Sequence, residues 1–367
     1  MAVLSRAEQA ESYIRKAILQ GRWKPGERMP LDYDLAAELG VGRVTVREAM
    51  APLVREGLIV RTPGVGTVVS EQIDAGTVVV LGSLNNAFSQ TGAYERLLLE
   101  HTYEVLGSTP YAGKLAIGSG ESIEEFTGSL HLFDDGDVRN TVGLISTAHW
   151  LPMASFLDNL QIKHVTIVPY PNGAGPVVHV DLGGMYGAGA KILKDHGYDD
   201  FALMHVDYSS QVAVEGSRAA EKAARVARDV LAAVDGCSNR LIPITYSDVA
   251  HGLAYSAFAK WWASPGRGKC LFVSDSAMVR GVLSAVSDMG IRVPDDLAIL
   301  VQTLAEEPVA FDVSLARLDF VIREIAETAC TLLMDLVEGR ETNITDRRVR
   351  ARYVPGNSLS YQRPKDN

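Results

Sequence analysis

The chain has 367 residues, too many for one ordinary hydrophobic core, so we expect two or three folding units. Its net charge of −10 is uneven: residues 1–70 hold ten Lys and Arg against eight Asp and Glu, about +2, which leaves about −12 for the rest. The sequence shows no apolar run long enough for a membrane span, no signal peptide, and three cysteines too scattered for a disulfide framework. These features argue against an exported or membrane protein and favour a cytoplasmic one.

Residues 1–70 have the pattern of a small domain of three helices and a hairpin. Apolar residues at helical spacing predict helices over 7–20, 32–39 and 43–56. Two β-rich runs follow, at 58–61 and 67–69, on either side of a turn that contains Gly64 and Gly66. Three helices and a hairpin make a winged helix, and Pro52 should bend the third helix toward its C-terminal half.

A polar segment, residues 71–76, is the predicted linker to a larger domain over 77–367. There, apolar strand candidates at 78–81, 142–145, 165–168, 201–205, 270–273 and 298–301 alternate with helix candidates at 93–106, 186–196, 215–233, 253–262 and 278–289. This alternation predicts an α/β fold of parallel sheets with helices on both faces, and the length allows two lobes.

The third predicted helix begins with side chains suited to DNA. Arg43, Thr45 and Arg47 lie in its first turn, away from the apolar face. Arginine can pair with guanine or hold a phosphate, threonine can contact either, and the positive end of the helix dipole favours phosphates. Taken alone, such arginines are also common as solvated surface charges.

The segment Tyr13–Val69 contains a series of short motifs: Pro25-Gly26-Glu27, Asp34-Leu35-Ala36, Leu39-Gly40-Val41, Thr45-Val46-Arg47-Glu48-Ala49, Glu56-Gly57-Leu58 and Gly64-x-Gly66-Thr67. With these motifs in this order, the segment resembles the GntR-family winged helix throughout. It implies DNA contacts at Arg43, Thr45, Arg47 and the wing glycine Gly64. Tyr33 stands where the family places an arginine, and its hydroxyl is a candidate replacement contact.

Two further departures concern the second helix and the wing. Leu31 replaces the usual Ser, which removes a side-chain N-cap worth about 1 kcal/mol. Val65 replaces the usual basic residue between the wing glycines, so any groove contact there should come from the backbone.

Four motifs stand out in the larger domain: Val178–Asp181 with Gly187–Leu193, Gly216–Arg218, Phe272–Met278 and Gly290–Leu297. Through these motifs, residues of about 77–356 resemble the effector domain of the LacI/GalR family, a two-lobed relative of periplasmic sugar-binding proteins. A GntR-type head on such a body resembles the architecture of arabinose repressors.

The resemblance implies effector contacts at Asp181 and Arg218, with Asp275, Ser274 and the loop residue Phe88 as further candidates. Asp181 follows a strand, Arg218 opens a helix after a strand and loop, and Asp275 follows another strand. Ligands bind at such positions in open parallel sheets. A helix cap or an ion pair is the structural alternative for these three, and a core position is the alternative for Phe88. Thr303 stands where the family has a carboxylate, which leaves the sugar class of the effector open.

We find no sequence sign of catalysis. The glycines of Gly183–Gly189 do not follow the G-x-G-x-x-G order, and the eight histidines form no HExxH pair, so we expect neither a cofactor nor a metal. We therefore predict a DNA-binding transcriptional regulator that acts as a repressor and is controlled by a sugar-like small molecule bound between the lobes. The alternatives are a non-sugar effector, a body that has lost ligand binding, and an enzyme fused to a DNA-binding head. Operator DNA and a second copy of the chain, in a homodimer, are the expected partners.

Overall fold

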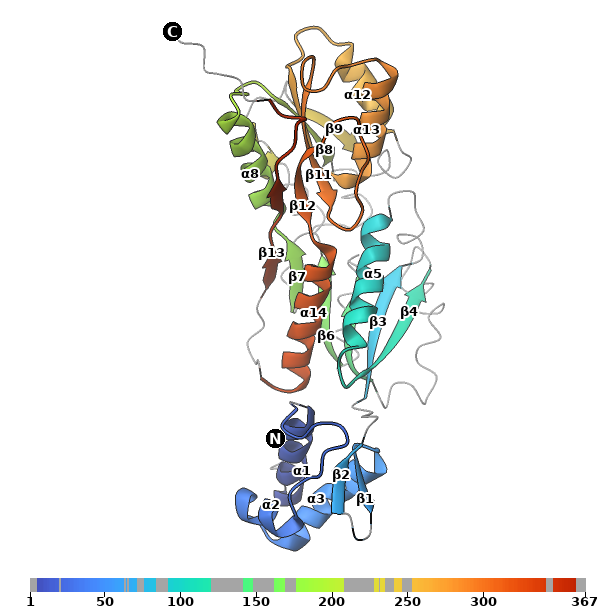
Figure 1. The fold of residues 1–367 in the computed structure, drawn as a ribbon, viewed down its shortest axis with the longest axis vertical. Coiled ribbons are helices and arrows are strands. Elements are labelled where there is room, and N and C mark those ends of the chain that lie inside the picture. The colour runs from blue at the N-terminus through green and yellow to red at the C-terminus, as the bar shows by residue number, and fades with distance from the viewer. Residues whose placement is uncertain are drawn as a thin grey trace.

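The structure is a computed structural model that describes residues 5–19, 21–62, 64, 66–70, 76–83, 92–119, 141–147, 162–168, 176–207, 228–230, 232–234, 241–245, 253–340 and 346–360. Figure 1 shows three units stacked along the long axis of the molecule: a small N-terminal unit and two α/β units.

The head, residues 6–69, is a winged helix. It consists of α1 (Arg6–Leu19), α2 (Asp32–Leu39), α3 (Arg43–Arg55) and an antiparallel hairpin of β1 (Ile59–Thr62) and β2 (Gly66–Val69). The apolar residues that predicted the helices face one another, since Ile14, Leu35, Val46, Met50 and Leu53 have no exposed surface. The three-helix and hairpin prediction is therefore confirmed, and α3 continues through Pro52 to Arg55.

Lobe 1 is built on a six-stranded parallel sheet with the strand order β13-β7-β6-β5-β3-β4. Its strands are β3 (Thr77–Ser83), β4 (Ala112–Gly118), β5 (Thr141–Ser146), β6 (Lys163–Val168), β7 (Val177–Val180) and β13 (Arg347–Val349). Two helices, α5 (Ala93–Leu106) and α14 (Ile322–Val337), pack side by side against it.

Lobe 2 is built on a second six-stranded sheet with the order β14-β12-β11-β10-β8-β9. Its strands are β8 (Ala202–Asp207), β9 (Leu241–Thr245), β10 (Cys270–Val273), β11 (Ala298–Leu304), β12 (Ala316–Phe320) and β14 (Arg352–Val354), of which only β14 runs antiparallel to its neighbour. Its helices are α8 (Leu182–Asp195), α12 (Ala254–Trp262) and α13 (Ser276–Asp288).

Strands in the middle of the sheets are buried along their whole length, because helices or loops cover both faces there. All seven residues of β11 and all four of β10 are buried. Cys270 and Cys330 are buried free thiols, and burial raises the pKa of both; Cys237 lies outside the described residues. None of the described helices is long and apolar enough to cross a membrane.

The chain passes between the lobes through three short segments: Asp181 between β7 and α8, Val321 between β12 and α14, and Arg350-Ala351 between β13 and β14. Because β7 ends at lobe 2 and β12 ends at lobe 1, the carboxyl ends of the parallel strands in the two sheets face each other. Ligands bind in the space between such facing strand ends in folds of this kind.

Candidate operator-binding surface and interlobe site

The first turn of α3 is open to a ligand. Gly42 is the N-cap residue and provides no side-chain cap, so the first N–H groups of the helix are left for solvent or an anion. Arg43 and Arg47 are exposed and Thr45 is half-buried, while Val46 of the same turn is buried. The structure thus places the three predicted contact residues in the open first turn of α3, with Arg43 and Arg47 exposed on the same side of the helix.

A carboxylate that the sequence analysis missed organises two arginines beside this turn. Arg47 Nε donates to Asp32 Oδ2 at 3.1 Å, and Arg61 Nη2 donates to Asp32 Oδ1 at 2.9 Å. Asp32 begins α2 and Arg61 belongs to wing strand β1, so the pair ties three elements of the head together. The side chain of Arg47 remains 62% exposed, which leaves its outer nitrogens available to a phosphate or a base.

The wing turn depends on two glycines with positive φ. Gly64 has φ +80° and Gly66 has φ +105°, backbone conformations that side chains disfavour. Arg28 lies against Gly66. If position 66 carried a side chain, its Cβ would be 3.0 Å from Arg28 Nε. Arg28 therefore places a positive charge against the wing, where the sequence lacks a basic residue between the glycines; Val65 itself lies outside the described residues.

Apolar and aromatic side chains are exposed around the same face. Val44 is 68% exposed, Tyr33 is 54% exposed and Leu31 is 41% exposed. Val44 was not predicted, although its place between Arg43 and Thr45 is the available signal, and an apolar group there suits a thymine methyl. Leu31 makes no side-chain cap on α2, as predicted.

At the interlobe edge, Asp181 acts as a helix cap. Its Oδ1 accepts a hydrogen bond from Gly184 N at 3.1 Å, and Arg348 and Arg350 approach the carboxylate at 3.8 Å each. The sequence left a helix cap or ion pair open as the alternative for this residue, and these contacts fit that alternative. Effector binding by Asp181 stays a prediction.

The other two lobe 2 candidates, Ser274 and Asp275, follow the carboxyl end of β10. Asp275 Oδ1 accepts a hydrogen bond from Ala277 N at 2.9 Å and so caps α13, and burial raises its pKa. Ser274 is 4% exposed and donates its hydroxyl hydrogen to Met204 O at 3.0 Å. Both side chains lie at the predicted edge but already serve the fold, and their effector contacts also stay predictions.

Arg218 and Phe88 lie outside the described residues. Most of the predicted helix over 215–233 does so too, and its described part is helical at 228–230 and 232–233.

A closed polar network explains the unusual Thr303. Its hydroxyl donates to Asp319 Oδ1, and Arg317 Nε donates to Asp319 Oδ2 at 2.8 Å. Gln302 Oε1 accepts from Ser276 N at 2.8 Å, and Gln302 Nε2 donates to Thr303 O at 2.7 Å. The carboxylate absent at position 303 is thus present one strand away, where it is 4% exposed and held by an arginine.

Lobe 1 holds a carboxyl group that the sequence analysis missed. Glu95, in the first turn of α5, is 4% exposed at the carboxyl ends of β3 and β5. Its Oε1 accepts hydrogen bonds from Ser83 N at 3.5 Å and from the hydroxyl of Thr147, and burial raises its pKa to about 7. The signal was its position, because Glu95 shares a helical face with the buried Leu98, Leu99, Thr102 and Leu106.

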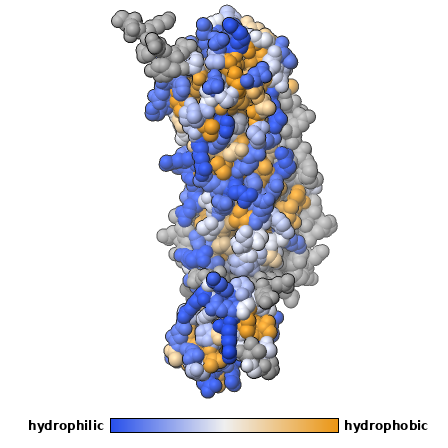
Figure 2. All heavy atoms as spheres, in the orientation of Figure 1, coloured by the Kyte–Doolittle hydropathy of each residue, from blue (hydrophilic) through white to orange (hydrophobic). Residues whose placement is uncertain are grey.

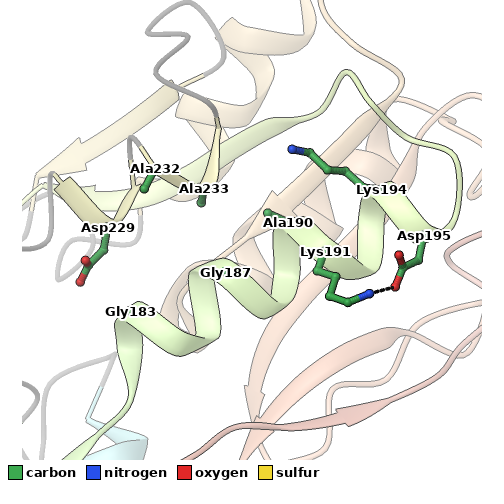
Figure 3. Close-up of a pocket in the computed structure, with 9 residues that line it drawn as sticks. All are labelled: Gly183, Gly187, Ala190, Lys191, Lys194, Asp195, Asp229, Ala232 and Ala233. Atoms are coloured by element: carbon green, nitrogen blue, oxygen red, sulfur yellow. Dashed lines mark hydrogen bonds and ion pairs between the residues drawn. The ribbon is translucent and has the colours of Figure 1, made fainter.

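Lobe 2 also has a groove of about 440 Å³ on α8, shown in Figure 3. Small residues line it, among them Gly183, Gly187 and Ala190, and its charged rim includes the exposed Lys191–Asp195 ion pair at 2.6 Å. None of the predicted effector residues belongs to its lining, so we do not treat it as the effector site.

The comparisons with known proteins divide the chain in the same way. Residues 6–69 match the family described as bacterial regulatory proteins, gntR family, and residues 190–359 match the periplasmic binding protein-like domain. The chain is a GntR-type head on a periplasmic-binding-protein-like body. This confirms the two resemblances and the fold class predicted from the sequence.

Curated relatives match the head most closely. The histidine utilization repressor of Klebsiella aerogenes is 41% identical over 64 residues, 17% of this chain and 27% of the relative. The probable fructoselysine utilization operon transcriptional repressor of Escherichia coli O157:H7 is 25% identical over 142 residues, 38% of this chain. The chain spans about half the length of that relative, 55%.

Solved structures resemble the body. A LacI family transcriptional regulator from Arthrobacter sp. FB24, solved with lactose, has a TM-score of 0.59 and 17% identity over 77% of this chain and 100% of its own. The lac repressor dimer bound to operator has a TM-score of 0.59 and 13% identity over 77% of this chain and 94% of its own. At these identities the similarity shows the fold, a two-lobed α/β body.

Proposed function

We propose that the protein is a transcriptional repressor whose affinity for operator DNA changes when a small molecule binds between the two lobes. The observation that carries the proposal is the open first turn of α3 in a GntR-type head, where Arg43 and Arg47 are exposed and Thr45 is half-buried. The curated relatives named as repressors, with matching heads, support the same reading.

Arg43 and Arg47 would contact different parts of the DNA, one a base and the other a phosphate. Arg43 extends from the open helix end and suits a base edge, while Arg47, held by Asp32, suits a fixed position on the phosphate backbone. Tyr33 and the wing backbone at Gly64 would add flanking contacts.

We infer that two copies bind one operator, because palindromic half-sites lie one helical turn apart, about 34–36 Å. Exposed apolar side chains at the ends of lobe 2 helices support dimerisation through the body: Leu253 is 44% exposed and Met289 is 40% exposed. Figure 2 shows apolar residues gathered on lobe 2, the end opposite the head.

A movement of the two lobes relative to each other would change the affinity for operator DNA. Three short connections permit a hinge motion, and an effector that contacts both facing edges would favour a closed arrangement. A coupling of about 1–3 kcal/mol would change operator affinity roughly 5–150-fold. The effector would be a sugar or related metabolite, and the protein would work in the cytoplasm as a regulator rather than an enzyme.

DNA binding is tested with an operator selected from a random duplex library. Arg43→Ala or Arg47→Ala should each weaken operator binding by about 1–3 kcal/mol at fixed salt, because each removes a base or phosphate contact. Arg55→Ala is the matched control, since Arg55 is an exposed arginine at the other end of α3. Equal affinity for all four proteins in a mobility-shift titration would refute the assignment of this face.

A further inference from the structure

Arg28 belongs to the wing in space, although it lies before the second helix in the sequence. Its segment runs beside β2 as a third strand of the wing sheet. Met29 N donates to Thr67 O at 2.9 Å, and Arg28 bridges to Val68 in antiparallel register. The backbone of Arg28 is therefore fixed relative to the wing.

The guanidinium of Arg28 lies on the backbone at the end of the hairpin. Side chains two residues apart in a strand share a face, so Val68 and Gly66 present the same face to Arg28. A Cβ at position 66 would be 3.0 Å from Nε, 3.2 Å from Nη2 and 3.5 Å from Cζ of Arg28. Gly66 pairs with Thr62 next to the turn. Because Gly66 has no side chain, the charge of Arg28 can lie directly against the wing tip.

This charge is available to an anion. Arg28 is exposed, and it forms no ion pair among the contacts that the structure describes. By contrast, Arg22 pairs with Glu38 at 2.6 Å. The adjacent carboxylate, Glu27, accepts a hydrogen bond from Lys24 N at 2.8 Å. The wing tip thus carries a fixed guanidinium whose donors are open to a ligand.

The wing leaves the head beside the turn that is expected to read DNA. Arg61 of β1 and Arg47 of α3 both bond the carboxylate of Asp32. When α3 occupies a major groove, the next groove across one phosphate strand is the minor groove. The three residues from Arg61 to Gly64 span about 10 Å of extended chain, which is enough to cross that strand.

The chemistry of the minor groove suits an arginine. The groove is narrow over A·T tracts, and its more negative potential there attracts arginine side chains. A guanidinium is planar and weakly hydrated, so it enters a narrow groove more easily than an ammonium group. The sequence has Val65 rather than a basic residue between the wing glycines, so Arg28 can provide the positive charge at the tip.

We propose that Arg28 enters the minor groove beside the α3 contact and makes operator binding depend on A·T base pairs there. This inference rests on the proposed function and adds a sequence requirement outside the part of the operator that α3 reads.

Base analogues in the minor groove test it. An operator is selected from a random duplex library with the full chain, and its core is kept while the flanking base pairs are made A·T, G·C or inosine·C. Inosine lacks the 2-amino group that guanine places in the minor groove, so inosine·C resembles A·T in the minor groove and G·C in the major groove.

We expect the wild type to bind the A·T and inosine·C flanks roughly fivefold more tightly than the G·C flank in mobility-shift titrations at fixed salt. Arg28→Ala should bind all three flanks with equal affinity. Arg55→Ala, a change of another exposed arginine of the head, should keep the preference. Thermal unfolding of each variant shows whether it is folded.

Three results would overturn the proposal: a wild type that binds all flanks equally, inosine·C behaving like G·C, or a flank preference that survives in Arg28→Ala. A loss of affinity that is the same for all flanks in Arg28→Ala would indicate a phosphate contact and would also overturn it.

Arg43→Ala separates this inference from the proposed function. If Arg43→Ala weakens binding to the core but the flanks make no difference, the operator-binding function stands and the role of Arg28 fails. If the wild type selects no operator from the library, the proposed function itself fails.

Discussion

The two lobes share one architecture and their carboxyl strand ends face each other, but the polar side chains at those ends differ in how fully they are hydrogen-bonded. In lobe 2, Ser274, Gln302, Thr303 and Asp319 are all bonded within the protein. In lobe 1, Glu95 is bonded through one oxygen only and the neighbouring Tyr94 hydroxyl is unpaired.

This difference has an energetic meaning. A fully bonded buried network rigidifies its surroundings, whereas an incomplete one keeps a free-energy penalty that a ligand can remove. Lobe 2 is thus suited to be the fixed frame, and lobe 1 is suited to gain stability when a ligand arrives. Four substitutions test the contrast.

The largest effect is expected for Glu95→Gln. Because the folded-state pKa of Glu95 is raised from 4.5 to about 7, its contribution to stability is complete below pH 4.5 and is lost as the pH rises to about 7. At pH 8 the variant, which is neutral and still accepts both hydrogen bonds, should be about 3 kcal/mol more stable than the wild type. Urea unfolding at pH 5 and pH 8 measures this gain, which should shrink at the lower pH. A gain that does not depend on pH would contradict the buried-charge account.

In lobe 2, Asp319→Ala should have the opposite sign. It leaves the buried Thr303 hydroxyl without an acceptor, while Arg317, 39% exposed, can turn toward solvent. We expect the free energy of unfolding to fall by about 2 kcal/mol. Asp312→Ala, an exposed aspartate of the same lobe, is the control and should change stability by less than about 0.5 kcal/mol. Equal effects of the two would mean that the network contributes nothing.

A single hydroxyl in each lobe gives a smaller and cleaner comparison. Tyr94→Phe removes an unpaired buried hydroxyl and should stabilise the protein by about 1 kcal/mol, whereas Ser274→Ala removes a made bond and should destabilise it by about 1 kcal/mol. Thermal or urea unfolding decides the signs. The same sign for both would show that the lobes do not differ in this respect.

The head repeats the contrast on a smaller scale, because α2 begins without a side-chain cap. Leu31→Ser should add a side-chain cap and raise the free energy of unfolding by about 0.5–1 kcal/mol. This free energy is that of the head if the head unfolds separately, and otherwise that of the whole chain. Leu31→Ala separates the cap from the loss of the leucine side chain. Serine no better than alanine would show that the N–H groups of α2 are satisfied by water.

The sequence by itself determined the helices and hairpin of the head, the alternating α/β body and the face that carries Arg43, Thr45 and Arg47. These features follow from local periodicity: buried residues recur at helical or strand spacing wherever an element packs on one core. Glycine marks the ends of some of those elements, since Gly40 ends α2 and Gly42 precedes α3.

Only the tertiary structure decided which polar groups are satisfied. The pairing of Arg47 and Arg61 through Asp32 joins residues 15 and 29 positions from that carboxylate, and the Thr303–Asp319 bond joins neighbouring strands. In the sequence Glu95 is an ordinary helix residue, and its burial comes from its place at the carboxyl ends of β3 and β5. Burial and hydrogen bonding depend on residues distant in sequence, and periodicity says which face is covered but not whether the polar group on it finds a partner.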